Sequence, residues 1–340
     1  MEAITIKDIA RALNLSTSTV SRALRGSYEI SPETKRLVME YAERMEYRPN
    51  PIALSLKANR SKVLGVIVPQ IANHFFSQAI NGIEAIAYNR GYHVMIMQSH
   101  ENYERELIAV QQALVRKVDG LLLSLSSQTT DIAHLQSLHD KKFPLVLFDR
   151  VASALDVPKI IADNYEGAFA ATEHLIQAGR RRIAHIGIAT YMSITQERLA
   201  GYRAALEKHG LPFDETLIRH VGLGQHEIDP IVSELLSQSP APDAIFTASD
   251  RLALGCMTAL RQFGVQIPEQ VALVGFTNLT VAHLLAPPLT TIEQPAQEIG
   301  QMAAERLILQ IERPQHKPIS DIQKLPTKLV VRESTAGGMK

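Results

Sequence analysis

TIKDIARALNLSTSTVSRALRG (residues 5–26) contains two short helical patterns separated by a very tight turn. In both, apolar residues recur at the spacing of one buried helix face. Two helices joined so closely form a helix-turn-helix unit, whose second helix enters the major groove of DNA. The apolar residues are Ile6, Ile9, Ala10 and Leu13 in the first helix and Val20, Ala23 and Leu24 in the second, which Ser16 or Thr17 can cap.

A third helical pattern follows in ISPETKRLVMEYAERMEY (residues 30–47). Ser31 can cap this helix, and Pro32 suits its first position. Residues 1–48 therefore predict a small bundle of three helices. The apolar residues of the third helix are Leu37, Val38 and Tyr41.

The exposed side expected for the second helix is made of short hydroxyls and one arginine. Such side chains pack poorly in a core, but they reach phosphate oxygens and base edges. They favour DNA binding over the alternative, a three-helix bundle that binds only a partner protein. These residues are Thr17, Ser18, Thr19, Ser21 and Arg22, with Arg25 close behind.

The formal net charge of the chain is zero, which taken alone speaks against a nucleic-acid partner. The average hides two basic stretches that contain no acid. Residues 17–26 carry two arginines, and residues 48–62 carry four basic residues. A surface that meets phosphates requires this kind of local concentration of positive charge.

From residue 63 onward, short β-rich runs alternate with helical stretches. The runs are continuously apolar, which is typical of parallel strands buried on both faces. This alternation predicts an open, doubly wound α/β architecture, and its length predicts two lobes. Residues 75–91 and 165–180 are expected helices, each with a glycine near its end. The expected strands are residues 63–69, 92–99, 118–126, 143–149, 159–163, 182–188, 243–250, 271–276 and 288–294.

Polar residues stand where these strands end. Ligands of doubly wound sheets bind beyond the carboxyl ends of the strands, so we expect these side chains to surround a cleft. Charged and amide groups suit a polyhydroxylated ligand, and a phenylalanine supplies a flat apolar floor. The expected effector-binding residues are Asn73, Phe75, Phe76, Asp149, Arg150, Asn164, Arg198, Asp250, Thr277 and Asn278.

Each of these residues also has a structural interpretation. Asp149, like the neighbouring strand-end residue Asp163, can cap the turn after its strand. Arg198 can be a surface ion-pair partner. Phe76 can belong to the core at helical spacing with Ile80. The prediction of a cleft therefore rests on the whole set of residues and not on any single one of them.

Residues 5–26 and 30–57 resemble the DNA-binding head of the LacI/GalR repressors. Further segments resemble the same family, in the family's order, along the rest of the chain. They are NHFFSQAINGIE (73–84), VDGLLL (118–123), LVLFDR (145–150), IIADNYEGAFAATEHLIQAGRRRIAHIG (160–187), RLAGYRAAL (198–206), SDRLALG (249–255) and PPLTTIEQP (287–295).

The resemblance implies a periplasmic-binding-protein-like core that dimerises and binds a small molecule, most often a sugar or a sugar derivative. It also implies that Arg198, Asp250 and the segment around Asn278 line the pocket. The chain departs from the family at Thr277, where the family usually has an aspartate. A neutral hydroxyl at this position cannot form the charge-assisted hydrogen bond that an aspartate forms with the ligand. The next residue, Asn278, offers an amide group in its place.

PNPIALSLKANRS (residues 49–61) stands where a flexible linker is the simple interpretation. Asn50 and Pro51 can start a helix, but eight residues are too few for a helix that is stable alone, so it should become ordered only when packed. The resemblance implies a hinge helix in the minor groove of DNA, with Ala53 and Lys57 at the DNA and Leu56 wedged between base pairs.

Motifs of other functional classes are missing from the sequence. It has no Walker phosphate loop, H-E-x-x-H pair or G-x-S-x-G elbow, so we expect no enzyme activity, cofactor or metal. The single cysteine, Cys256, excludes an internal disulfide and is expected to be buried. The N-terminus lacks a signal-peptide core and no run suits a membrane span, which favours a cytoplasmic protein. A transporter's solute-binding protein would share the core fold but would not need the N-terminal helices.

We therefore expect an all-α DNA-binding head followed by an α/β core of two doubly wound lobes. Its expected function is that of a transcriptional repressor of carbohydrate genes, a homodimer on a near-palindromic operator, controlled by a sugar-like effector between the lobes. The expected divisions are a head (1–48), a hinge (49–62) and a core (63–340), with lobe 1 at 63–163 and 294–326 and lobe 2 at 164–293 and 327–340.

Leu56→Ala should weaken operator binding and reduce the bend of the bound DNA, because alanine is too short to wedge between base pairs. Binding and bending can be measured on one operator fragment by gel retardation with permuted site positions. An unchanged bend angle would make the hinge segment a simple tether.

Overall fold

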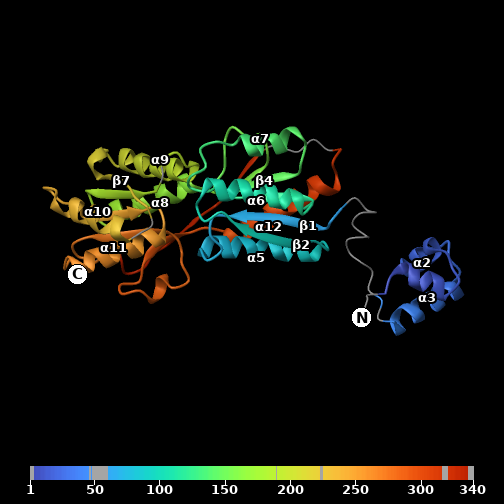
Figure 1. Ribbon diagram of the computed structural model, residues 1–340. Coiled ribbons are helices and arrows are strands. Elements are labelled where there is room, and N and C mark those ends of the chain that lie inside the picture. The colour runs from blue at the N-terminus through green and yellow to red at the C-terminus, as the bar shows by residue number, and fades with distance from the viewer. Residues whose placement is uncertain are drawn as a thin grey trace. The chain divides into compact units, whose positions relative to one another are not determined.

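The computed structural model describes residues 4–45, 47, 60–188, 190–222, 225–315 and 321–335. The chain forms two compact units, Met1–Ser61 and Lys62–Lys340 (Figure 1). Residues 48–59 lie outside the described residues, and with them lie the expected hinge contacts of Ala53, Leu56 and Lys57.

The N-terminal unit contains α1 (Ile6–Ala12), α2 (Thr17–Leu24) and α3 (Pro32–Arg44). The three predicted helices are confirmed, and α2 and α3 begin at the expected caps, where Ser16 and Ser31 accept hydrogen bonds from backbone N–H groups. Leu37, expected on the apolar side of α3, is instead 48% exposed, because the buried face of this helix follows Val38 and Ala42. The buried core of the unit is Ile9, Ala10, Val20, Ala23, Val38 and Ala42.

The first sheet of the core has the strand order β11-β5-β4-β3-β1-β2, with parallel pairing throughout. Helices α5 and α12 share one hydrophobic core with it, and α6 and α7 share another. The strands are β1 (Val63–Val68), β2 (His93–Gln98), β3 (Gly120–Leu123), β4 (Leu145–Phe148), β5 (Lys159–Ala162) and β11 (Ile322–Leu325). The helices are α5 (His74–Asn89), α6 (Tyr103–Val115), α7 (Ala133–Asp140) and α12 (Ala296–Glu312).

The second sheet has the order β12-β10-β9-β8-β6-β7, and only β12 runs antiparallel to its neighbour. Helices α8 and α9 share one hydrophobic core with this sheet, and α10 and α11 share the other. Its strands are β6 (Ile183–Gly187), β7 (Ile218–His220), β8 (Ala244–Thr247), β9 (Ala272–Thr277), β10 (Thr290–Glu293) and β12 (Lys328–Val330). Its helices are α8 (Asn164–Gln177), α9 (Ser193–Lys208), α10 (Gln225–Ser237) and α11 (Asp250–Gln262).

Two sheets, each covered by helices on both faces, confirm the predicted doubly wound α/β core (Figure 1). The nine predicted strands are all present. Strands β7, β11 and β12 were missed because they are short edge strands without an apolar run. The expectation of burial on both faces is wrong for β2, which is an edge strand with exposed residues. In the parts of the chain that the structure describes, no helix is both long and apolar enough to cross a membrane.

The chain crosses between the two sheets three times, after β5, β10 and β11. Each crossover follows the carboxyl end of a strand, at Asp163, Gln294 and Pro326. The carboxyl ends of the strands in both sheets therefore lie near the junction of the lobes. This topology brings the polar strand-end residues of the two lobes toward each other.

Helices α5 and α12 pack so closely that neither contact position has room for a side chain. A β-carbon on Gly82 would lie 2.0 Å from the carbonyl oxygen of Gln297, and one on Gly300 would lie 2.0 Å from that of Ala79. Backbone cannot yield to such a contact as a flexible side chain can. These two glycines therefore fix the distance between the helix that begins at the cleft and the helix that follows a crossover.

Gly82→Ala should destabilise the core by about 2 kcal/mol, because the clash outweighs the gain of roughly 1 kcal/mol in helix propensity. The control is Asn81→Ala on the exposed side of α5, which should be neutral or slightly stabilising. Urea unfolding midpoints measure both effects. A more stable Gly82→Ala protein would contradict the close helix contact.

Candidate DNA-binding surface and ligand cleft

The outer side of α2 presents the residues predicted to contact DNA. The hydroxyl of Ser16 accepts a hydrogen bond from the backbone N–H of Thr19 at 3.0 Å and so fixes the start of the helix. It also lies 2.7 Å from the hydroxyl of Ser18, which groups the hydroxyls at this helix end. Thr17, Ser18, Arg22 and Arg25 are exposed, and Thr19 and Ser21 are half-buried.

The two arginines of this surface have different partners. Arg22 Nη1 lies 3.3 Å from a carboxylate oxygen of Glu29, and both side chains are about half exposed. Arg25 donates to the carbonyl of Ser21 at 3.1 Å and to its hydroxyl at 3.0 Å. An exposed ion pair contributes only about 0–1 kcal/mol, so Arg22 can exchange Glu29 for a base or a phosphate at small cost.

Between the lobes of the core lies a cavity of about 70 Å³. Eight of the ten predicted effector-binding residues line it, and they come from both lobes. These are Asn73, Phe75, Phe76, Asp149, Arg150, Arg198, Asp250 and Thr277. The cavity thus brings together residues that are up to 204 positions apart in the sequence, from Asn73 to Thr277.

Arg198 is buried, which contradicts its interpretation as a surface ion-pair partner. Its guanidinium donates to Asn164 Oδ1 from Nε at 3.0 Å and from Nη2 at 2.8 Å, and from Nη1 to the carbonyl of Ala248. It also stacks on the ring of Phe276 at 3.9 Å. Burial lowers the pKa of Arg198 to about 10, so it keeps its charge at neutral pH. Within the described ranges, no carboxylate forms an ion pair with it.

Asn164 was predicted to bind the effector directly, and the structure places it behind Arg198. Its side chain is buried, and it donates to the carbonyl of Ala162 and to Glu197, each at 3.1 Å. Its oxygen is occupied by Arg198. Asn164 therefore orients the guanidinium that faces the cavity.

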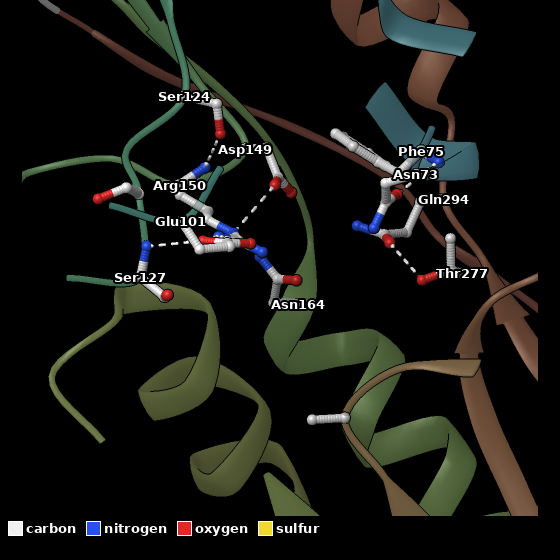
Figure 2. Close-up of polar contacts among 12 residues, drawn as sticks. Asn73, Phe75, Glu101, Ser124, Ser127, Asp149, Arg150, Asn164, Thr277 and Gln294 are labelled. Carbon is white, nitrogen blue, oxygen red and sulfur yellow. Dashed lines mark hydrogen bonds and ion pairs between the residues drawn. The ribbon is translucent and has the colours of Figure 1, made fainter. Parts of the chain in front are cut away.

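Arg150 lines the cavity, and its charge is balanced by Glu101, a residue that the sequence analysis did not single out. Both carboxylate oxygens of Glu101 accept from Arg150 Nη1, at 2.9 and 2.7 Å, and Glu101 also accepts from the backbone N–H of Ser127 at 2.8 Å (Figure 2). Burial would raise the pKa of Glu101, but the charge and hydrogen bonds of Arg150 more than offset this, and its pKa is lowered.

Asp149 lies next to this pair, with a carboxylate oxygen 3.9 Å from Arg150 Nε. Burial raises its pKa, and the charges of Arg150 and Arg198 oppose that rise. Its backbone has a φ of 58°, which is uncommon for a residue other than glycine. With Arg150 paired to Glu101, Asp149 is the carboxylate of this lobe best placed to accept hydrogen bonds from a ligand.

Asp250 is buried, and its oxygens already have partners in the protein. It accepts from the hydroxyl of Thr291 at 2.5 Å and from the backbone N–H of Leu279 at 2.7 Å. A β-carbon on Gly275 would lie 2.1 Å from its Oδ1, so only glycine permits this approach. Burial raises the pKa of Asp250, and these hydrogen bonds oppose the rise. Asp250 therefore holds the loop after β9 in place at the cavity wall.

Thr277 and Asn278 both lie at the end of β9 with positive φ, 134° and 59°. For a β-branched residue such as Thr277 this backbone is strained, by about 1–3 kcal/mol. Thr277 donates to Gln294 Oε1 at 3.3 Å (Figure 2), whereas Asn278 does not line the cavity and accepts from Arg332 at 2.9 Å instead. The loop thus presents Thr277 to the cavity and turns Asn278 away from it.

The structural interpretations apply to some of the remaining residues. Asp163 caps α8, accepting from the N–H of Glu166 at 3.2 Å. Phe76 shares the hydrophobic core with Ile80 while one part of its surface lines the cavity. Asn73 caps α5 with a hydrogen bond from the N–H of Phe75 at 2.9 Å, so it too has a structural role at the cavity (Figure 2).

Sequence reasoning missed polar residues such as Gln294 and Arg251, which line the cavity, and Glu101, which pairs with the cavity residue Arg150. Glu101 follows β2, and Gln294 follows β10, so both obey the rule of polar residues at strand ends. Glu101 lacked a signal because its partner, Arg150, is 49 positions away. Cys256 is fully buried, as predicted, and burial raises its pKa to about 12.

Glu101→Gln should cost the core roughly 3 kcal/mol at pH 7, because it removes the carboxylate that Arg150 binds at 2.7 Å and leaves only Asp149, 3.9 Å away, to balance the buried charge. Since the pKa of Glu101 is lowered in the folded protein, its contribution is present above its unfolded pKa of about 4.3 and is lost as the pH falls below it. The difference in unfolding free energy between wild type and variant should therefore stay constant down to about pH 4 and shrink as the pH falls further. A difference that does not depend on pH would contradict the ion pair.

Two family models match the chain. One, described as "Periplasmic binding proteins and sugar binding domain of LacI family", matches residues 61–331, and the other, described as "Bacterial regulatory proteins, lacI family", matches residues 5–50. The two matches fall on the α/β core and on the helical head.

Similar proteins match over nearly their entire length. The HTH-type transcriptional repressor PurR of Vibrio parahaemolyticus is 32% identical, with 97% of this chain and 98% of that protein covered. The ribose operon repressor of Halalkalibacterium halodurans is 32% identical, with 98% of each covered. The structure of the lac repressor dimer bound to operator and an anti-inducer matches with a TM-score of 0.84 and 25% identity, over 98% of this chain and 99% of that one. The chain therefore belongs to the LacI family of bacterial regulatory proteins and is a DNA-binding transcriptional regulator, as its resemblance implied.

Proposed function

We propose that this protein represses genes of carbohydrate uptake or catabolism and that a small molecule in the cleft between its lobes controls its affinity for DNA. The names of the relatives support repression, and the ribose operon repressor supports a carbohydrate role. The lac repressor structure, a dimer on its operator, supports a homodimer on a near-palindromic site.

The observation that carries the proposal is the convergence of residues from both lobes on one cavity. Asp149 and Arg150 come from the first lobe, and Arg198 and Thr277 come from the second. Donors and acceptors on opposite walls suit a polyhydroxylated ligand, because each hydroxyl can both donate and accept. A ligand held from both sides also couples its binding to the arrangement of the lobes.

The cavity is much smaller than the ligand it would hold. Its volume is about 70 Å³, whereas ligand pockets measure about 300–1,000 Å³. Effector binding therefore requires the lobes to separate or rotate. Regulation follows if DNA binds the two lobe arrangements with different affinity.

The DNA contacts of the proposal follow the chain from head to hinge. Thr17, Ser18 and Arg22 would contact bases, and Thr19, Ser21 and Arg25 would contact phosphates. Ala53, Leu56 and Lys57 would make the hinge contacts. We further infer the domain limits 1–48, 49–62 and 63–340, with lobe 1 formed by 63–163 and 294–326 and lobe 2 by 164–293 and 327–340.

A transporter's solute-binding protein is the rival function, because it would use a core of the same fold. The match of residues 5–50 to the regulatory family disfavours it. Relatives named as repressors likewise favour a role without catalysis, in the cytoplasm where the DNA is. Gel retardation with operator-like DNA, with and without sugars, separates the two functions.

Arg198→Ala should leave operator affinity within about twofold of wild type but weaken effector binding at least about tenfold, since it removes a charged donor from the cavity. Arg203→Ala, on the exposed side of the same helix, is the control.

Conversely, Arg22→Ala should reduce discrimination between operator and random DNA by about 10- to 100-fold while the core still binds effector. Fluorescence anisotropy and calorimetry measure the two affinities. If the Arg198→Ala protein still responds normally to the ligand, Arg198 is not part of the effector-binding site.

A further inference from the structure

A second hollow, of about 540 Å³, lies next to the cleft. It is formed by the start of α5, the loop after β9, and the two crossovers that lead into α12 and β12. Its polar lining includes His74, Gln78, Thr280, Gln297, Glu298 and Lys328. Unlike the cavity between Arg198 and Asp149, this outer pocket already has the volume of a ligand site.

The outer pocket and the inner cavity share three wall residues, Phe75, Thr277 and Gln294. The two spaces therefore lie on either side of the same side chains. Figure 2 shows these three residues grouped together, apart from the group around Arg150. The side chains of Thr277 and Gln294 are joined by a 3.3 Å hydrogen bond, which is at the long end for a hydroxyl donor.

Gln294 has a donor without a partner at this wall. Its side chain is buried, with 8% of the residue exposed, yet among the described residues its Nε2 has no hydrogen-bond acceptor. A buried unpaired donor costs about 1–3 kcal/mol. The strained backbone of Thr277 lies beside it. Costs of this kind gather where a ligand later supplies the missing partner.

The chemistry of the outer pocket suits an uncharged sugar unit. Gln78, Gln297 and Thr280 offer neutral donors and acceptors, and the ring of Phe75 and the carbons of Pro295 offer an apolar surface. The acids Glu293 and Glu298 outnumber the single cation Lys328, which disfavours an anion. Carboxylates and amides together satisfy the hydroxyls of a saccharide.

We propose that the effector is an uncharged saccharide of at least two sugar units. One unit lies in the inner cavity against Arg198 and Asp149, and the next lies in the outer pocket against Gln78. Gln294 Nε2, at the wall between them, donates to an oxygen near the linkage. Thr277 belongs to this arrangement, because its short neutral side chain leaves room at the wall. The inference rests on the proposed function, since it concerns the ligand of the same cleft.

The test is calorimetric titration of the full-length protein with glucose, cellobiose and maltose, and of Gln78→Ala with the same sugars. Gln78 touches only the outer pocket, so its loss should affect only the second sugar unit. At least one disaccharide should bind about tenfold more tightly than glucose, and Gln78→Ala should remove about tenfold of that affinity while changing glucose binding by less than about twofold. Gln111→Ala, exposed on α6, is the matched control and should change neither.

The proposal is overturned if glucose binds as tightly as both disaccharides, if Gln78→Ala weakens glucose and disaccharide equally, or if none of the three sugars binds. Failure of the proposed function has a different signature. In that case a disaccharide binds with the predicted dependence on Gln78, but operator affinity measured by anisotropy stays the same with and without it.

Discussion

A buried guanidinium must have its N–H groups hydrogen-bonded, and the way Arg198 meets this requirement shapes the cleft. Its partners are the amide of Asn164 at the start of α8, the carbonyl of Ala248 after β8, and the ring of Phe276 in β9. Three elements are thus aligned around one side chain. Because these partners are neutral, the positive charge of Arg198 remains available to a ligand and to Asp149 in the other lobe.

The rest of the cleft combines rigid supports with a few groups in unfavourable states. Gly82 and Gly300 fix the contact of α5 with α12, and Gly275 lets Asp250 hold the loop after β9. The unfavourable groups are the strained backbone of Thr277 and the amide nitrogen of Gln294, which has no acceptor among the described residues. Proteins retain such costs mainly at functional sites, and for this reason we propose that the wall between the two pockets contacts the ligand.

Local signals in the sequence predict most of the fold. The hydroxyl caps of α2 and α3 and the apolar central strands are visible because each depends on neighbouring residues. Strand β12 was missed because its three residues are stabilised by pairing with β10, 35 or more positions earlier in the chain. Burial of Leu37 was wrongly expected because the choice of buried helix face depends on how the three helices pack.

The site was predictable as a set but not in its internal roles. The rule that strand ends meet at one edge brought Asp149, Asp250 and Thr277 together correctly, while only tertiary contacts show that Asp250 braces a loop and that Glu101 neutralises Arg150. We expect ligand and operator to affect each other through the core. If the tightest-binding sugar changes operator affinity by some factor, operator must change the affinity for that sugar by the same factor, because the two binding equilibria are linked. Calorimetric titration of that sugar with and without saturating operator should give Kd values that differ at least about fivefold, and equal Kd values would contradict the account.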